Sequence, residues 1–453
     1  MGYHDIKSGV RIHPLTLFAT ALTGELGVSS SQKATTQLLP SLPHNSNRYS
    51  SKMDTTMDAA LAQIKQLVPA DGVARQRLMA SLHKLAYSME SPDDTLHRYG
   101  AMTLQTACVK IGLDLGLFRY LVESGRPVTV EDMARKTGAD GQLLARVLRY
   151  LGAIGSVDQD GSNQYAANLV TRNLAQKVTE AGVSHYFSTV SPQYQALPGF
   201  LKRTGYGNPT DERHTVFQEA WNTERHGFEW FSERPENLAY FNDFMAARRE
   251  PELSWLTVYP VRQEAQGLAA DRALFLNIGG GIGHQCAQFR ERYPDLPGRV
   301  LLQDMAHTIA QALPTPGVEN MAHDFFEPQP IRGAKFYFLR GVLHNHPPHK
   351  VRQLLGRTKE AMAADSVLLL DEMVLPETGV HVDAASMDLT MLAAFAGMER
   401  TEAQWRQAVS EAGLELDQAF VYNPVSHETV MSVRLPASGG HSTAKGGTDT
   451  MDA

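Results

Sequence analysis

A glycine-rich turn between a predicted strand and a predicted helix most constrains the fold of this chain. The turn reads Leu-Asn-Ile-Gly-Gly-Gly-Ile-Gly-His over residues 276–284. Glycine lets the backbone turn sharply and lets a ligand approach it closely. By itself the turn does not distinguish the binding of a nucleotide, a dinucleotide or S-adenosylmethionine (SAM). It does indicate an open α/β sheet with a ligand at the carboxyl ends of its strands.

The rest of the C-terminal half agrees with that sheet. Short apolar runs alternate there with amphipathic helices, which is typical of a mostly parallel sheet. The expected strands cover 273–278, 299–302, 335–339, 366–371, 419–422 and 429–434. The preceding residues are helical and aromatic-rich. Some of their aromatic side chains are expected to wall a site for a flat apolar ligand.

The N-terminal half has a different pattern. Helices are expected over 55–89 and from 92 towards 117, followed by a short helix at 130–136, a longer helix after 141, and two strands around a turn at 160–161. This order is that of a winged helix-turn-helix. A winged-helix DNA-binding protein is the remote alternative, because the formal net charge is −7 and no long Lys/Arg run supplies a phosphate-binding surface. A dimerisation platform is the preferred interpretation.

These patterns give an α/β fold class with an additional N-terminal helical domain. The expected divisions are a disordered leader at 1–52, a helical and winged-helix dimerisation domain at 53–180, a helical connector that contributes to the substrate site at 181–268, a SAM-binding catalytic domain at 269–436, and a disordered tail at 437–453. Cys108 and Cys286 lie in apolar segments without metal or disulfide spacing. They indicate buried thiols, a cytoplasmic location and no metal site. No apolar run has the length of a membrane span.

Acidic residues follow the next two strand positions. Asp304 lies about 20 residues beyond the glycine turn, where a carboxylate can accept hydrogen bonds from both hydroxyls of a ribose. Asp324 and Phe325 follow the next strand position. An acid there suits the exocyclic amine of adenine, and an aromatic ring can pack on the base. All of these residues are expected at one edge of the sheet.

From Met53 onwards, the chain resembles the fungal and plant small-molecule O-methyltransferases of the caffeate type. That family has an N-terminal winged-helix dimerisation domain and a C-terminal class I SAM-binding, Rossmann-like domain. The resemblance implies SAM as cofactor and a partly interlocked homodimer. It also implies cofactor contacts by Gly279, Gly280, Gly281 and Gly283 at the methionine moiety, Asp304 at the ribose, Asp324 and Phe325 at the adenine, and Arg340 as a basic contact.

The same resemblance implies a catalytic base at His344, directly after the fourth strand, supported by Glu372 and Glu399. The chemistry agrees with it. A hydroxyl must lose its proton as its oxygen is methylated, and a histidine with a pKa of about 6.5 is a suitable acceptor. Neighbouring carboxylates can orient the imidazole and stabilise its cation. The predicted activity is methyl transfer to a hydroxyl of an apolar small molecule in secondary metabolism.

The chain departs from the family pattern at two places. Asn277 replaces the usual Asp, and Asn345-His346 replaces the usual Asp and aromatic residue after the base. SAM-dependent pericyclases of the leporin type share this fold but perform dehydration and cycloaddition without methyl transfer. The presence of the base and both acids in this chain favours methyl transfer, and the pericyclase remains the alternative. The candidates for substrate contact are His185, Phe241, Arg249 and Met391, and the substrate itself is not identified.

Overall fold

The computed structural model of the chain describes residues 46–247 and 254–437. These form two units, the first ending at Val68 and the second beginning at Pro69. The first contains α1 (Ser46–Gln66), which starts inside the expected leader. The remainder of that leader, the expected tail and Arg249 lie outside the described residues.

Four short helices open the second unit. They are α2 (Gly72–Tyr87), α3 (Pro92–Gly100), α4 (Met102–Asp114) and α5 (Leu117–Ser124). The two helices expected before residue 117 are thus each divided. Asp71 accepts a hydrogen bond that caps the start of α2 and so accounts for the first division. Ser91 forms a reciprocal capping box with Asp94 at the start of α3, whereas no side-chain cap accompanies the second division, at Ala101.

A compact winged helix follows, as predicted. It comprises β1 (Val128–Thr129), α6 (Val130–Thr137), α7 (Gly141–Ala153), β2 (Asp158–Gln159) and β3 (Gln164–Ala166), with the strands in the order β1-β3-β2. Helix α7 begins because Asp140 caps it. Its apolar residues recur at helical spacing, and Leu144, Leu148 and Leu151 are buried in the core of this part.

The helical connector leads to the sheet. After α8 (Leu169–Leu174), which still belongs to the expected dimerisation domain, the elements are α9 (Lys177–His185), the π-helical turn η2 (Tyr186–Val190), α10 (Ser191–Arg203), α11 (Val216–Trp221), α12 (Gly227–Trp230), η3 (Phe231–Glu233), α13 (Pro235–Ala247), η4 (Trp255–Thr257) and α14 (Val261–Glu264). Helix α9 packs against α13, and α10 against α11. A π-helical turn is rare and frequently marks a functional site.

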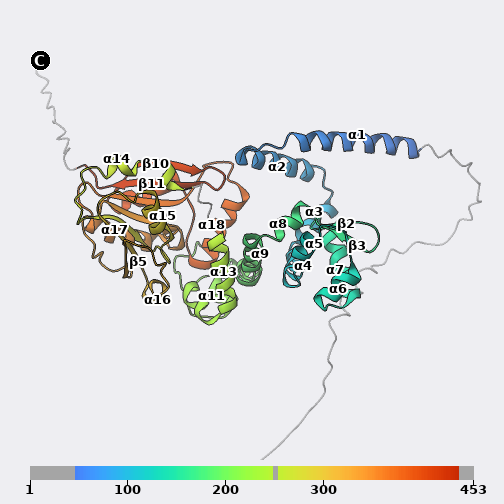
Figure 1. The fold of residues 1–453 in the computed structure, drawn as a ribbon, viewed down its shortest axis with the longest axis horizontal. Coiled ribbons are helices and arrows are strands. Elements are labelled where there is room, and N and C mark those ends of the chain that lie inside the picture. The colour runs from blue at the N-terminus through green and yellow to red at the C-terminus, as the bar shows by residue number, and fades with distance from the viewer. Residues whose placement is uncertain (1–45, 248–253, 438–453) are drawn as a thin grey trace, which may run out of the picture. The chain divides into compact units, whose positions relative to one another are not determined.

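A mixed sheet forms the C-terminal part, in the strand order β10-β11-β8-β7-β4-β5-β6 (Figure 1). Its strands are β4 (Ala273–Ile278), β5 (Arg299–Asp304), β6 (Val318–Ala322), β7 (Phe336–Arg340), β8 (Val367–Leu375), β10 (Glu415–Asn423) and β11 (Glu428–Arg434), and the short β9 (Arg400–Thr401) pairs with the end of β8. The helices are α15 (His284–Arg292), α16 (Ala306–Ile309), η5 (Leu343–Asn345), α17 (Pro348–Ala361), α18 (Val382–Phe395) and α19 (Glu402–Glu411). Strands β4 to β8 are parallel, whereas β11 is antiparallel to both neighbours.

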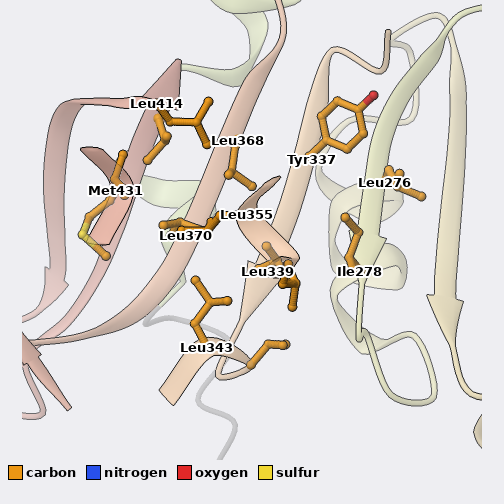
Figure 2. Packing of buried hydrophobic residues seen from close by; sticks show 14 of the residues in the cluster. Leu276, Ile278, Tyr337, Leu339, Leu343, Leu355, Leu368, Leu370, Leu414 and Met431 are labelled. Atoms are coloured by element: carbon orange, nitrogen blue, oxygen red, sulfur yellow. The ribbon is translucent and has the colours of Figure 1, made fainter. Parts of the chain in front are cut away.

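Both faces of the sheet are covered. One carries an aliphatic layer that includes Leu276, Leu339 and Leu370 together with Leu355 of α17 (Figure 2). The other carries an aromatic layer with Phe275 and Phe338. Because successive side chains of a strand alternate between faces, the last residues of β7 and β8 project into two different environments. The carboxyl edge of these strands is where the candidate site lies.

Candidate active site

The glycine turn lies between β4 and α15, as predicted. Its glycines at 279, 281 and 283 have φ angles of +63°, +61° and +96°, a region that disfavours other residues. A Cβ on Gly280 would lie 2.4 Å from Asn277 Nδ2 and 2.5 Å from Leu302 Cδ1. The turn therefore excludes a side chain at 280 and presents bare backbone to the sheet edge.

Asp304 lies beside this turn at the end of β5. Its Oδ2 accepts a hydrogen bond from the N–H of Gly281 at 2.8 Å, and its Oδ1 accepts one from the N–H of Met305, also at 2.8 Å. The carboxylate is half-buried. Because each carboxylate oxygen can accept more than one hydrogen bond, both retain capacity for a ligand hydroxyl.

Asp324 and Phe325 follow β6, with their side chains in different roles. The Asp324 carboxylate is exposed and accepts a hydrogen bond from the N–H of Phe326 at 2.9 Å. The Phe325 ring lies next to the glycine turn, 3.5 Å from where a Cβ on Gly279 would be. The aromatic ring thus borders the turn, and the acid stabilises its own loop.

Arg340, at the end of β7, is held by two acids. Its Nε lies 3.4 Å from Asp371 Oδ2, and its Nη2 lies 3.5 Å from Glu428 Oε1. Asp371 also accepts a hydrogen bond from the Tyr422 hydroxyl at 2.9 Å. Burial raises the pKa of Asp371 to about 7, although the Arg340 guanidinium opposes this shift. The predicted contact of Arg340 with a cofactor remains a prediction.

The three predicted catalytic residues are brought together. His344 lies in η5, and its Nδ1 is 2.7 Å from Glu399 Oε1. Glu372 Oε1 accepts hydrogen bonds from the N–H groups of Val342 at 3.0 Å and Leu343 at 2.8 Å, which fixes the backbone that leads into η5. Burial lowers the pKa of His344, but the carboxylates of Glu372 and Glu399 outweigh it and leave the pKa above its ordinary value.

A close backbone contact positions this histidine. A Cβ on Gly397 would lie 2.0 Å from the carbonyl oxygen of His344. The same oxygen accepts a hydrogen bond from the N–H of Met398 at 3.1 Å. Asp388 of α18 accepts one from the N–H of Glu399 at 2.9 Å. The segment after α18 and the loop that carries His344 are therefore fixed against each other.

The predicted substrate residues His185 and Phe241 lie in one aromatic cluster. The His185 ring is 5.4 Å from Phe241, 6.1 Å from Phe244 and 6.4 Å from Phe231, measured between ring centroids. Its Nδ1 is buried and has no hydrogen-bond partner among the described residues. Burial lowers the pKa of His185 to about 4, so the imidazole is neutral at physiological pH.

Met391 belongs to a second apolar cluster, with Ala394 and Phe395 of α18. Ring contacts link the two clusters. Phe395 stacks on Phe228 at 5.1 Å, and Phe228 lies edge-on to Phe241 at 6.3 Å. An aromatic layer thus connects the His185 cluster to the helix whose C-terminal end adjoins His344.

Two features of the site were missed in the sequence. Arg400 is buried directly after Glu399 and could have been noticed from that adjacency. His346 Nδ1 lies 3.2 Å from Glu212 Oε2 of the connector, and the hydrogen bond to His346 lowers the pKa of Glu212. No local pattern signals this second contact, because its partners are 134 positions apart.

No helix within 46–247 or 254–437 has the length and apolarity required to cross a membrane. Among the same residues, no group of three or more His, Cys, Asp or Glu side chains is placed to hold a metal ion.

The chain was compared with known proteins. The model of the O-methyltransferase domain matches residues 211–415, and that of the O-methyltransferase dimerisation domain matches residues 97–177. O-methyltransferase ucdC of Aspergillus ustus is 42% identical over 347 residues, which cover 77% of this chain and 91% of the relative.

Two solved structures are also similar. One, described as a pericyclic reaction enzyme, has 36% identity and a TM-score of 0.77, covering 84% of this chain and 99% of its own. The other, LepI in complex with SAM, has 35% identity and a TM-score of 0.76, covering 86% and 100%. The predicted fold, an N-terminal dimerisation domain followed by a Rossmann-like methyltransferase domain, is confirmed. This chain belongs to the O-methyltransferase family.

Proposed function

We propose that the protein methylates a hydroxyl group of an apolar small molecule, with SAM as methyl donor and His344 as general base. The observation that carries this proposal is the 2.7 Å contact between His344 Nδ1 and Glu399 Oε1 at the carboxyl edge of the sheet. A carboxylate that holds one imidazole nitrogen leaves the other available for a substrate proton.

The residues at the edge suit an adenosine-containing cofactor. A backbone turn without room for a side chain at Gly280, the Asp304 carboxylate and the Phe325 ring adjoin one another. They match the needs of a ligand that has a polar tail, a ribose diol and a flat base. The similarity to LepI in complex with SAM supports this assignment. SAM, when bound, supplies a methyl group that is already activated for transfer.

His344 would accept the proton of the substrate hydroxyl through Nε2. The product of that step is an imidazolium, and both Glu372 and Glu399 favour this cation. Glu399 keeps the ring oriented, whereas Glu372 acts on the backbone that carries it. A general base in this arrangement typically contributes a rate factor on the order of a hundred to ten thousand.

The aromatic layer supports an apolar acceptor. His185, Phe241 and Met391 belong to or adjoin this layer, which has flat ring faces suited to an aromatic or polyketide-like molecule. The neutral His185 would offer one hydrogen bond to a polar group of that molecule. Arg249, which lies outside the described residues, remains a candidate from the sequence.

A second function is favoured by one specific observation. The buried, unpartnered His185 Nδ1 offers a site of proton exchange that is separate from His344. The similarity to a pericyclic reaction enzyme supports dehydration and cycloaddition-type chemistry with a bound but unconsumed SAM. Under this alternative, methyl transfer does not occur.

One measurement separates the two functions. The protein is incubated with labelled SAM and a panel of phenols and extracts from its own producing cell. Methyl transfer predicts one S-adenosylhomocysteine for each product molecule. Product without S-adenosylhomocysteine would overturn the methyltransferase proposal and favour the pericyclase.

The cofactor assignment has a separate test. Asp304→Ala is expected to weaken SAM binding by about 1.5–3 kcal/mol, because charge-assisted hydrogen bonds to the ribose are lost. Calorimetry with SAM measures this, and Asp295→Ala, at an acid outside the predicted site, provides the comparison. Wild-type affinity in a folded Asp304→Ala protein would remove Asp304 from the cofactor site.

We also propose that the protein is a homodimer. The match to a dimerisation domain supports pairing, and α4 exposes Leu104 and Ile111 in this region. Exposed apolar side chains on one helix favour burial against a partner. Sedimentation at micromolar concentration is expected to give a dimer, and a stable monomer would contradict this.

A further inference from the structure

The catalytic cluster contains two buried acids that are only partly satisfied. Glu372 and Glu399 are 4% and 2% exposed. In each, Oε2 is buried and has no hydrogen-bond partner among the described residues. Burial of a carboxylate is costly unless another charge compensates it. A nearby cation is therefore expected on physical grounds.

Arg400 is placed to be that cation. It is 3% exposed and follows Glu399 directly. In the pairing of β9 with β8, Arg400 lies opposite Val374. Because side chains alternate along a strand, Glu372, two positions before Val374, projects to the same face as Val374 and Arg400. The Arg400 guanidinium and the Glu372 carboxylate therefore lie on one face, and both Glu372 and Glu399 act electrostatically on the guanidinium.

The guanidinium is held in place from two sides. Its Nη1 donates a hydrogen bond to the carbonyl oxygen of Met398 at 3.2 Å, and its Cζ lies 4.9 Å from the ring centroid of Trp405. Nη2 is buried without a hydrogen-bond partner in the described part of the chain. Neither carboxylate forms an ion pair with Arg400 within 4.0 Å among the described residues. The guanidinium therefore acts on the acids through space and does not lock either of them.

The formal charges show what this cation does. With a neutral His344, the two ionised acids and Arg400 sum to one negative charge, and protonation of His344 brings the sum to zero. Without Arg400, each of these two sums is more negative by one charge. Glu372 and Glu399 would then hold the proton of the His344 imidazolium more tightly. Asp388 of α18, half-buried beside the Glu399 N–H, adds to that negative potential when ionised.

We propose that Arg400 is a positioning residue that offsets the negative charge around His344 and so allows His344 to release its proton between turnovers. The base thus starts each cycle as a neutral imidazole. This inference rests on the role of His344 in the proposed function. The charge balance among Arg400, Glu372, Glu399 and His344 does not depend on that function, since it also applies to the protein without substrate.

Arg400→Met removes the charge and retains an apolar side chain beside Trp405. We expect the acid limb of the pH–kcat profile to move to higher pH by about one unit or more, because His344 stays protonated longer. Activity at neutral pH falls about tenfold and recovers at alkaline pH. Arg400→Lys retains the charge and is expected to keep the wild-type limb. Arg352→Met, which breaks an exposed ion pair with Glu411, is the matched surface control.

The imidazole is also titrated by NMR in the protein without substrate. The expected result is the same upward shift of the His344 midpoint in Arg400→Met, and a return towards the wild-type midpoint in Arg400→Met/Glu372→Gln, where the charge sum is restored. This double variant also relieves the unpaired buried charge if Arg400→Met alone does not fold. An unchanged midpoint in both variants, or a rate loss equal at every pH, would overturn the inference. A shifted midpoint in a protein that never forms S-adenosylhomocysteine would instead overturn only the proposed function.

Discussion

Asp371 and Glu372 are adjacent buried acids of β8, but they belong to different environments. Asp371 projects to the aromatic face, where Arg340 and Tyr422 bind its carboxylate. Glu372 projects to the opposite face, where backbone N–H groups and the charge of His344 act on it. The comparison indicates that Asp371 connects the ends of neighbouring strands, whereas Glu372 fixes the loop that carries His344. The two faces should therefore respond differently to substitution.

The largest expected difference is in rate. His344→Ala should lower kcat by about a hundredfold or more while leaving SAM affinity intact, because proton removal is an effect on the transition state. Residual activity should rise with pH as the acceptor ionises unaided. Steady-state kinetics and calorimetry measure the two quantities. Tyr422→Phe, on the aromatic face, is the control and should change kcat by less than about threefold. If His344→Ala and Tyr422→Phe lowered kcat equally, the two faces of the sheet would not differ in their contribution to catalysis.

Glu372 should matter to stability through its acceptor oxygen. In Glu372→Ala, the buried N–H groups of Val342 and Leu343 lose their acceptor. The free energy of unfolding should fall by about 2–4 kcal/mol, since each unsatisfied group costs about 1–3 kcal/mol. Glu372→Gln retains an acceptor and should lose much less. Urea denaturation of both variants checks this, and equal losses would assign the effect to the charge alone.

The pH dependence of stability should distinguish the two faces. Burial raises the pKa of Asp371 from 3.8 to about 7, so the folded state binds its proton more tightly than the unfolded state. Stability from this group should decline as the pH rises between these values, by at most about 1.4 kcal/mol per pH unit. His344, whose pKa is raised above 6.5, stabilises the fold when protonated, and this contribution is lost as the pH rises through its folded pKa.

Asp371→Asn should remove the decline in the free energy of unfolding that Asp371 causes at lower pH. The decline caused by His344 at higher pH should remain. Denaturation at pH values from 4 to 8 measures both slopes. A variant that retains the decline between pH 4 and 7 would show that another group causes it.

The smallest expected effect concerns a single hydroxyl. Tyr422→Phe removes the hydrogen bond to Asp371 and should lower the free energy of unfolding by about 1–2 kcal/mol. Thermal denaturation at pH 8, where Asp371 is ionised, should show a larger loss than at pH 5. The reverse order would mean that the hydroxyl does not serve the charged acid.

The sequence was informative where local pattern and local chemistry agree. The glycine turn, the leucines of α7 and the buried strand β4 all follow from spacing and apolarity. A strand position was expected before Asp324, but the residues of edge strand β6 were not identified, because Val-Glu-Asn-Met-Ala contains no apolar run and none of its residues is fully buried. An edge strand has only one neighbour, so its sequence is less constrained.

The candidate site was predictable only at the ends of strands. His344 follows β7, Glu372 follows the expected strand 366–371 although β8 continues to Leu375, and Glu399 belongs to a recognisable phrase; the fold brings all three to one edge. The Glu212–His346 pair depends on how the distant connector packs against the sheet. Periodicity carries no information on such contacts.

The contact between Gly397 and the His344 carbonyl also bears on how such enzymes diversify. Met391 and Phe395 of α18 belong to an apolar cluster that tolerates exchange, but any new side chain at 397 would displace the loop that carries His344. During evolution, the apolar residues of α18 can therefore be exchanged one at a time, whereas position 397 has to stay a glycine. Variant libraries that aim to change the substrate preference should keep Gly397 and vary residues one or more helical turns before it.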